Sequence, residues 1–196
     1  IHTGPFGNIA TGNSSVIADK MGIHMCDYLV TEAGFGADMG AERFFNIKCR
    51  VSGMKPDAAV LVATVRALKA HSGLYKVVAG KPLPAEMLQE NPEDVRAGAA
   101  NLAKQIENVL AHGVSPVVAI NAFPTDFASE HDVIREIAES MGARVAVCTH
   151  FSDGGAGAVD LANAVVDACN EPNNFHFLYD ESVSLKEKVS AVATKI

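Results

Sequence analysis

The stretch Ala59-Val60-Leu61-Val62-Ala63-Thr64 indicates the fold class, because it is apolar along its length and passes directly into a polar segment. A strand that is apolar at consecutive positions, instead of at alternate ones, is typical of a parallel sheet covered on both faces. Similar short runs occur at Tyr28–Thr31, Pro116–Asn121 and Val145–Cys148. We therefore predict four buried strands, at residues 28–31, 59–64, 116–121 and 145–148.

Segments with helical spacing separate these runs. One is expected to begin at Asn91-Pro92 and to end at His112-Gly113, and a second to begin at Ser129 with Asp132 and to end before Gly142. A further helix follows residue 160, and a capping box, formed by Ser184 and Glu187, opens the last one. The expected apolar faces are Val95, Leu102, Ile106 and Val109 in the first helix, Val133, Ile134, Ile137 and Met141 in the second, and Ala162, Val165, Val166 and Cys169 in the third.

This alternation predicts an α/β fold with a mostly parallel sheet and helices on both faces. Residues 74–84 interrupt it, because they contain Gly80, Pro82 and Pro84 and show no clear period. We expect a surface excursion there, which is either functional or a plain insertion.

Composition limits the function classes. A chain of 196 residues with 48% hydrophobic and 20% charged residues is long enough for one globular domain. A net charge of -7 without a basic stripe argues against nucleic-acid binding, although helix N-termini still allow small anions to bind. No apolar run approaches about 18 residues and no signal peptide is recognisable, so we expect a cytoplasmic protein without a membrane segment. The four cysteines form no C-x-x-C pair, which favours buried thiols over a zinc or redox site.

A polar segment follows each predicted strand, at residues 31–40, 64–73, 121–126 and 149–157. All of these segments except residues 121–126 contain glycine. In an open parallel sheet, ligands bind outside the carboxyl ends of the strands. The sequence therefore predicts a binding site along one edge of the sheet.

The first of these segments carries two carboxylates, Glu32 and Asp38. Magnesium is often held by a few carboxylates together with water and phosphate oxygens, so the pair is a candidate metal site. The alternative for Asp38 is a cap on a helix that starts near Gly40. Glu32 follows an apolar run, and a carboxylate buried there would need a partner.

The second segment carries Arg66 and Lys69, which lie three residues apart and therefore on one helical face. Such a pair suits a phosphate or a carboxylate such as formate, and the alternative is a solvated basic turn. His71 is a further candidate, although a structural hydrogen-bonding role is the plainer interpretation.

In the third segment Asn121 and Asp126 bracket Phe123-Pro124. An amide at a strand end can contact the edge of a purine and a flat apolar pair can pack on its ring, whereas the alternative is an ordinary turn. Gly154-Gly155-Ala156-Gly157 resembles a loop that opens a helix, without G-x-G-x-x-G spacing. No G-x-x-x-x-G-K-[ST] motif occurs in the chain, so the usual phosphate-binding loop is missing from it.

These motifs resemble one known family, the formate–tetrahydrofolate ligases. Residues 62–73 resemble its pattern V-A-T-[IV]-R-A-L-K-x-[HN]-G-G with one departure, Ser72. Residues 2–15 resemble H-x-G-P-F-[AG]-N-I-A-H-G-x-x-S, with Thr11 in place of the usual histidine. Residues 31–40 match T-E-A-G-F-G-A-D-x-G without a break. Shorter matches are Lys48-Cys49-Arg50 and Asn121-Ala122-Phe123-Pro124-Thr125-Asp126, and the similarity covers essentially all 196 residues.

The resemblance implies an ATP-dependent ligase of one-carbon metabolism that joins formate to tetrahydrofolate through formyl phosphate. It also implies a P-loop NTPase fold, a homotetramer, Mg²⁺ and a stimulating monovalent cation. The chain would then be the central part of a single nucleotide- and folate-binding domain. Because the family carries its P-loop upstream and its folate-sandwiching aromatic residues further downstream, the chain alone is expected to be inactive.

On this resemblance, the candidate site residues fall into four groups. They are Arg66, Lys69 and His71 for catalysis; Asn121, Phe123, Pro124 and Asp126 for the nucleotide; Pro5, Phe6, Asn8, Gly34 and Gly36 for substrate; and Glu32 and Asp38 for the metal. Two alternatives stay open: another P-loop-type ATP-dependent ligase or metallochaperone, and a non-catalytic module that binds a partner chain or merely packs.

Overall fold

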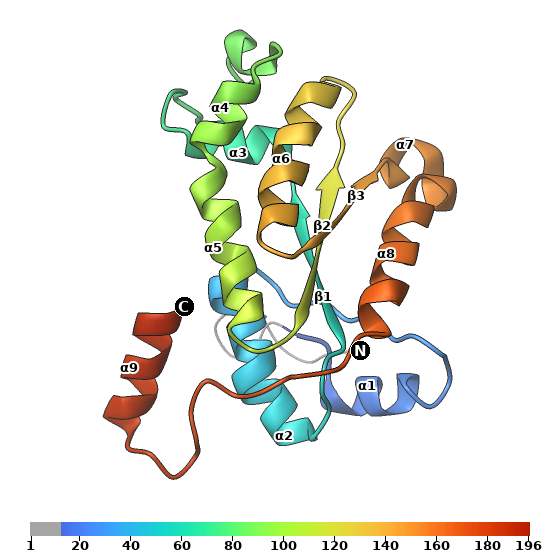
Figure 1. Cartoon of the computed structure of the whole chain (residues 1–196), viewed down its shortest axis with the longest axis vertical. Coiled ribbons are helices and arrows are strands. Elements are labelled where there is room, and N and C mark those ends of the chain that lie inside the picture. Colours follow the sequence, from blue (N-terminus) through green and yellow to red (C-terminus); the bar gives the residue numbers. More distant parts are fainter. Residues whose placement is uncertain (1–12) are drawn as a thin grey trace. The chain divides into compact units, whose positions relative to one another are not determined.

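The computed structural model describes residues 13–196 (Figure 1). These residues form two compact units. Among the described residues, unit 1 comprises residues 13–56, Asn108–Val114 and Asn174–Ile196, and unit 2 comprises Asp57–Glu107 and Ser115–Asn173. Within residues 13–196, no helix has the length and hydropathy needed to cross a membrane.

Unit 2 is built on a parallel sheet of β1 (Ala58–Ala63), β2 (Ser115–Asn121) and β3 (Arg144–Cys148), in the order β1-β2-β3. The central strand β2 is buried from Pro116 to Ile120. These strands confirm three of the four predicted ones within one residue at each end. Because all three run the same way, their carboxyl ends meet at one edge.

Helices cover both faces of this sheet, as predicted (Figure 1). One face packs against α3 (Val65–His71), α4 (Pro92–Ala97), α5 (Ala99–Leu110) and α6 (Ala128–Ser140), and the other against α8 (Val159–Cys169). The core of the first face includes Leu102, Ile106, Val118, Ile120 and Ile134. An α/β fold with a parallel sheet is therefore confirmed.

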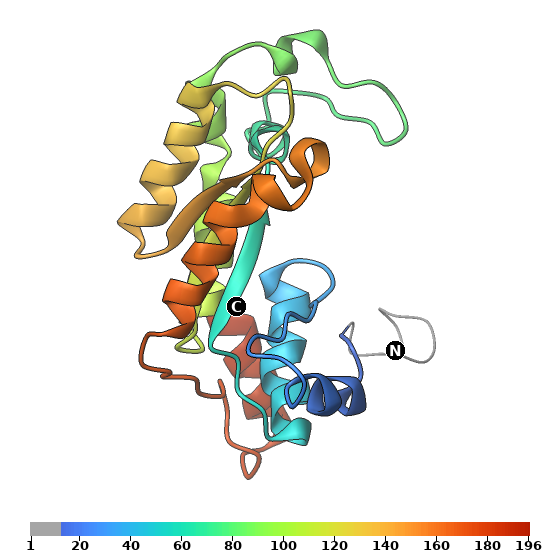
Figure 2. The same cartoon turned by 90° about the vertical axis from the view of Figure 1, so that its right-hand side faces the viewer.

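Shorter elements complete unit 2. They are the 3₁₀ turns η3 (Ala85–Leu88) and η4 (Gly154–Ala158) and the single turn α7 (His150–Asp153). Residues 74–84 form no regular element and project as a loop, the blue-green segment at the upper right of Figure 2. The predicted surface excursion is thus confirmed.

The helix predicted to start at Asn91-Pro92 is divided at Gly98 into α4 and α5. A Cβ on Gly98 would overlap the backbone carbonyl of Leu68 in the middle of α3, so only glycine allows the two backbones to approach this closely. The predicted apolar face survives the break, because Val95, Leu102, Ile106 and Val109 are all buried.

The start predicted for the next helix was wrong. Its N-cap is Phe127, and the carboxylate of Glu130 accepts a hydrogen bond from the Phe127 backbone N–H at 3.1 Å. Ser129 instead bonds the Glu90 carboxylate through its hydroxyl. The capping box of Ser184 and Glu187 is confirmed at the start of α9 (Leu185–Lys195) in unit 1.

Unit 1 contains α1 (Val16–Gly22), the π-helical turns η1 (Ala37–Ala41) and η2 (Phe44–Cys49), α2 (Arg50–Ser52) and α9. The strand predicted at residues 28–31 is not formed, and Val30 is 85% exposed. A strand needs a backbone partner, and the pairing that the described residues show nearby is an isolated bridge between Asn13 and Ala33. The apolar run was therefore a misleading signal in this place.

A buried polar chain joins three segments of unit 1. His112 Nδ1 lies 3.0 Å from the Asn108 carbonyl, which only accepts, so this nitrogen carries the proton. His112 Nε2 then accepts from the Asn46 amide at 3.0 Å, and Asn46 Oδ1 accepts from Leu178 N–H. Burial lowers the pKa of His112 below its usual value, which favours this neutral form.

Candidate functional site

The carboxyl ends of the three strands of unit 2 bring the predicted strand-end segments to one edge of the sheet. Ala63 pairs with Ile120, and Asn121 pairs with Cys148. Thr64, directly after β1, caps α3 by accepting a hydrogen bond from Ala67 N–H at 3.1 Å. This cap fixes the first turn of α3, which carries Arg66, against the strand end.

Arg66 reaches the loop that follows β2. Its Nη2 donates to Thr125 Oγ1 at 3.0 Å, and its guanidinium carbon lies 3.9 Å from the centroid of the Phe123 ring. Its Nε is buried but makes no hydrogen bond to any residue in the described part of the chain. A guanidinium that is held in place yet keeps a free donor is suited to bind an anion. The structure thus brings a predicted catalytic residue and a predicted nucleotide-binding residue into contact.

Asp126 closes the same loop. Its side chain is 2% exposed, and its Oδ2 accepts from Phe123 N–H at 2.9 Å and lies 3.4 Å from His131 Nε2. The local geometry of residues 123–126 is therefore the turn that was considered as the alternative. Phe123 is half-buried beneath Arg66, and Pro124 is exposed.

Lys69 has a different environment from Arg66, although both lie on α3. Its side chain is 1% exposed and its ammonium forms an ion pair with Glu130. It also donates to the carbonyl oxygens of Met87 at 3.1 Å and Gln89 at 2.6 Å. These contacts engage all three donors of the ammonium group. His71, the last residue of α3, is exposed.

Ser72, the departure from the family pattern, fits the end of α3 without strain. Its backbone is right-handed, with φ -62° and ψ -21°, whereas the next residue, Gly73, takes φ +76°. The Ser72 hydroxyl donates to Lys69 O at 2.6 Å and accepts from Leu74 N–H at 3.2 Å. The left-handed position that requires glycine is thus the second of the pair, which this chain retains.

The loop after β3 folds back on itself. Thr149 N–H donates to Gly157 O at 2.9 Å, and a Cβ on Gly157 would come 2.5 Å from Thr149 Oγ1, so glycine is required there. Cys148 Sγ lies 3.0 Å from His150 Nδ1. As predicted, the glycine-rich stretch leads into a helix, α8.

Phe151 is the residue of this loop that sequence reasoning missed. Its side chain is 92% exposed, in the helical turn α7 that follows the end of β3. An exposed aromatic ring at a strand-end edge is available to stack on a flat ligand. The only signal in the sequence was one aromatic residue within an otherwise polar and glycine-rich segment.

The predicted metal residues lie in unit 1. Glu32 and Asp38 are both exposed, so Glu32 does not need the partner that a carboxylate buried at a strand end would require. Asp38 lies in the first turn of η1, whose N-cap is Gly36. Two exposed carboxylates fit Mg²⁺ chemically, because this ion keeps several water ligands. Among the described residues, no three His, Cys, Asp or Glu side chains form a metal cluster.

The loop that carries these carboxylates is tightly folded. A Cβ on Gly40 would overlap the backbone carbonyl of Gly34, and Phe35 adopts φ +69°, which is unusual for a residue with a side chain. The ring of Phe35 is 64% exposed and lies 5.7 Å from the Arg43 guanidinium. The other predicted substrate residues, Pro5, Phe6 and Asn8, lie outside the described residues, as does Thr11.

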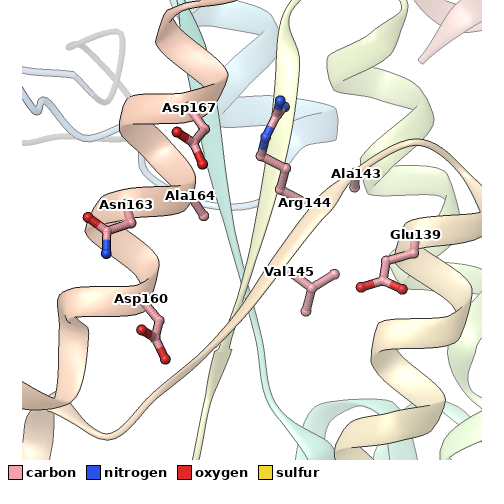
Figure 3. A pocket seen from close by; sticks show the side chains of 8 residues that line it. All are labelled: Glu139, Ala143, Arg144, Val145, Asp160, Asn163, Ala164 and Asp167. Carbon is pink, nitrogen blue, oxygen red and sulfur yellow. The ribbon is translucent and has the colours of Figure 1, made fainter.

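An open pocket of about 470 Å³ runs along β3 between α6 and α8 (Figure 3). Its polar lining consists of three carboxylates, one amide and one guanidinium, from Glu139, Asp160, Asp167, Asn163 and Arg144. Arg144 is already paired with Glu171 at 2.6 Å. None of the residues predicted for the site lines this pocket.

Comparison with known proteins agrees with the resemblance of the motifs. The family model described as "Formate--tetrahydrofolate ligase" matches residues 1–196. The chain is 69% identical to the formate–tetrahydrofolate ligase of Saccharopolyspora erythraea and 66% identical to that of Cutibacterium acnes, in each case over the whole chain and 35% of the relative. It is 54% identical to that of Dehalococcoides mccartyi, again over the whole chain and 33% of the relative. The chain thus spans about a third of the length of these curated relatives, and it belongs to the formate–tetrahydrofolate ligase family.

Proposed function

We propose that the protein containing this chain catalyses the ATP-dependent ligation of formate to tetrahydrofolate. The products would be 10-formyltetrahydrofolate, ADP and phosphate. The observation that carries this proposal is the placement of Arg66, which is held by Thr125 and Phe123 and keeps one buried donor without a partner in the described chain. The parallel sheet with helices on both faces is compatible with the P-loop NTPase fold that the resemblance implies.

The reaction needs two group transfers. A formate oxygen attacks the γ-phosphorus of ATP, the bond from phosphorus to the bridging oxygen breaks, and ADP leaves. N10 of tetrahydrofolate then attacks the formyl carbon, loses its proton, and displaces phosphate. Phosphoryl transfer depends mainly on positioning and charge stabilisation, so Arg66 would bind formate and the charge that develops on formyl phosphate.

The loop after β2 would contact the nucleotide. Asp126 holds the backbone of this loop, which leaves Asn121 at the strand end and the exposed Pro124 as candidates to touch the base. Phe123, packed under Arg66, would orient the guanidinium instead of stacking openly. Phe151 offers an exposed face for a flat ring of one of the substrates. His71 remains a proposed catalytic residue on the family resemblance.

Glu32 and Asp38 would hold Mg²⁺ together with water, because both carboxylates are exposed and this ion keeps several water ligands. When bound, this ion supplies charge neutralisation at the phosphates. Gly34 and Gly36, together with Pro5, Phe6 and Asn8, stay proposed substrate-binding residues on the family resemblance. A stimulating monovalent cation, a homotetrameric assembly and a cytoplasmic location are proposed on the same ground.

The test is formation of 10-formyltetrahydrofolate by the full-length protein, with each of formate, ATP and tetrahydrofolate omitted in turn. We expect product only when all three are present, and ATP consumption that requires formate. Residues 1–196 alone should form no product, because their sequence contains no G-x-x-x-x-G-K-[ST] motif. ATP consumption without formate in the full-length protein would contradict the proposal.

A further inference from the structure

We propose that Glu130 and Lys69 form a positioning pair, which holds the Arg66 guanidinium in its place against the loop after β2. Neither residue needs to touch a substrate in this role. The proposal rests on the proposed function, because it takes Arg66 as the residue that binds formate and the transferred phosphoryl group.

One buried carboxylate joins three segments of unit 2. Glu130 is fully buried, and its Oε2 accepts from Phe127 N–H at 3.1 Å. Its Oε1 accepts from Asn91 N–H at 2.9 Å and is paired with the Lys69 ammonium. Glu130 thereby links α3, the start of α4 and the end of the loop that runs from Asn121 to Phe127.

The position of Arg66 depends on two of the segments that Glu130 links, α3 and the loop after β2. It lies three residues before Lys69, on the same face of α3, so pinning Lys69 fixes the rotation of the helix that carries Arg66. Its two partners, Phe123 and Thr125, belong to the loop whose last N–H is held by Glu130. The pair thus fixes the position of the Arg66 guanidinium and also that of Phe123 and Thr125, which the guanidinium contacts.

The other hydrogen bonds of the Lys69 ammonium group explain why this position carries a charged side chain. Its ammonium also holds the carbonyl oxygens of Met87 and Gln89, in and just after η3, which follows the exposed loop of residues 74–84. An apolar side chain of the same length would fill the space, but it would leave the two carbonyl groups without the ammonium donor and would leave the Glu130 carboxylate without a neutralising cation. Loss of the pair would therefore loosen α3 and the loop together, even if the fold were kept.

The test is a double-mutant cycle in the full-length protein, with Glu130→Gln, Arg66→Lys and the two combined. The quantities measured are kcat and KM for formate and for ATP, at a temperature where every variant keeps the wild-type circular dichroism spectrum. Misplacement of a substrate-binding group by about 1 Å can cost about 10²-fold, so Glu130→Gln is expected to lower kcat/KM for formate about 10-fold. In the Arg66→Lys background the same change should cost less than about 2-fold, because the group it positions has already been altered.

Glu136→Gln is the matched control, since Glu136 lies on the same helix and is paired with Arg96 at 2.7 Å on the exposed surface. It should leave the kinetic constants unchanged. If Glu130→Gln does not fold, Lys69→Met combined with Glu130→Gln removes the unpaired buried charge and is used in the same cycle.

A multiplicative effect, with the full loss also seen in the Arg66→Lys background, would overturn the positioning role while leaving the proposed function intact. An Arg66→Lys variant with unchanged kinetics for formate would instead show that Arg66 was wrongly assigned in the proposed function, and the positioning role would fail with it.

Discussion

Replacing Lys69 by Met should destabilise unit 2 far more than the similar size of the two side chains suggests. The substitution keeps most of the side-chain volume but removes the charge that faces Glu130. Both side chains of the pair are 1% exposed, so the remaining carboxylate cannot be solvated in place. Removing one partner of a buried ion pair typically costs about 3–5 kcal/mol.

The structure favours the lower end of this range. After the substitution, Glu130 would still accept hydrogen bonds from the N–H groups of Phe127 and Asn91. Two backbone donors stabilise a carboxylate but do not neutralise it, so we expect a loss of about 3 kcal/mol. This corresponds to roughly 150-fold faster hydrogen exchange for amides protected by opening of this region.

The assay is hydrogen exchange followed by mass spectrometry on the full-length protein, with peptides that cover α3 and α6. Arg96→Met is the control. Its partner Glu136 lies on α6, the helix that also carries Glu130, but the side chains of Arg96 and Glu136 are 44% and 65% exposed. An exposed pair contributes little, so exchange in the control should stay within about twofold of wild type. Similar exchange in both variants would refute the argument that burial makes Lys69 important.

Three further predictions concern single side chains. Gly98→Ala should lower the thermal midpoint, although alanine is the better helix former, because the new Cβ meets the Leu68 carbonyl; a raised midpoint would contradict this. Burial raises the pKa of Cys49 to about 12, so below about pH 10 its thiolate stays scarce and iodoacetamide should label the exposed Cys26 but not Cys49; equal labelling of both at pH 8 would disprove it. Phe151→Ala should raise KM for ATP or for tetrahydrofolate without changing the thermal midpoint, because the ring is 92% exposed; unchanged KM values would exclude stacking.

The sheet of unit 2 was predictable because burial on both faces leaves a continuous apolar signal, as in β2 from Pro116 to Ile120. The same signal failed at residues 28–31, where Val30 is exposed and no ladder forms. Hydropathy records the side chains, but a strand also requires a partner backbone, which a single sequence does not show. The break at Gly98 was hidden for a similar reason, since it depends on the distant carbonyl of Leu68.

The candidate site shows the same division. The strand-end rule located Arg66 and the loop of residues 121–126, and the structure brings them into contact. Spacing alone treated Arg66 and Lys69 as equivalent cations. Within residues 13–196, however, Arg66 keeps one buried donor without a partner, whereas Lys69 is fully engaged with Glu130 and two carbonyl groups. That difference arises from Glu130, about sixty residues further along the chain, and the periodicity of α3 does not contain it.

The most direct test of the account is the kcat of Arg66→Ala in the full-length protein, measured as formation of 10-formyltetrahydrofolate with ATP, formate and Mg²⁺ at saturation. Arg96→Ala, an exposed arginine of α4, serves as the control. We predict a loss of at least about 10²-fold for Arg66→Ala and no loss for the control, because a charge-stabilising group of the transition state is removed only in the first. An unchanged kcat for Arg66→Ala would contradict the central claim that this guanidinium binds the reacting formate and phosphoryl groups.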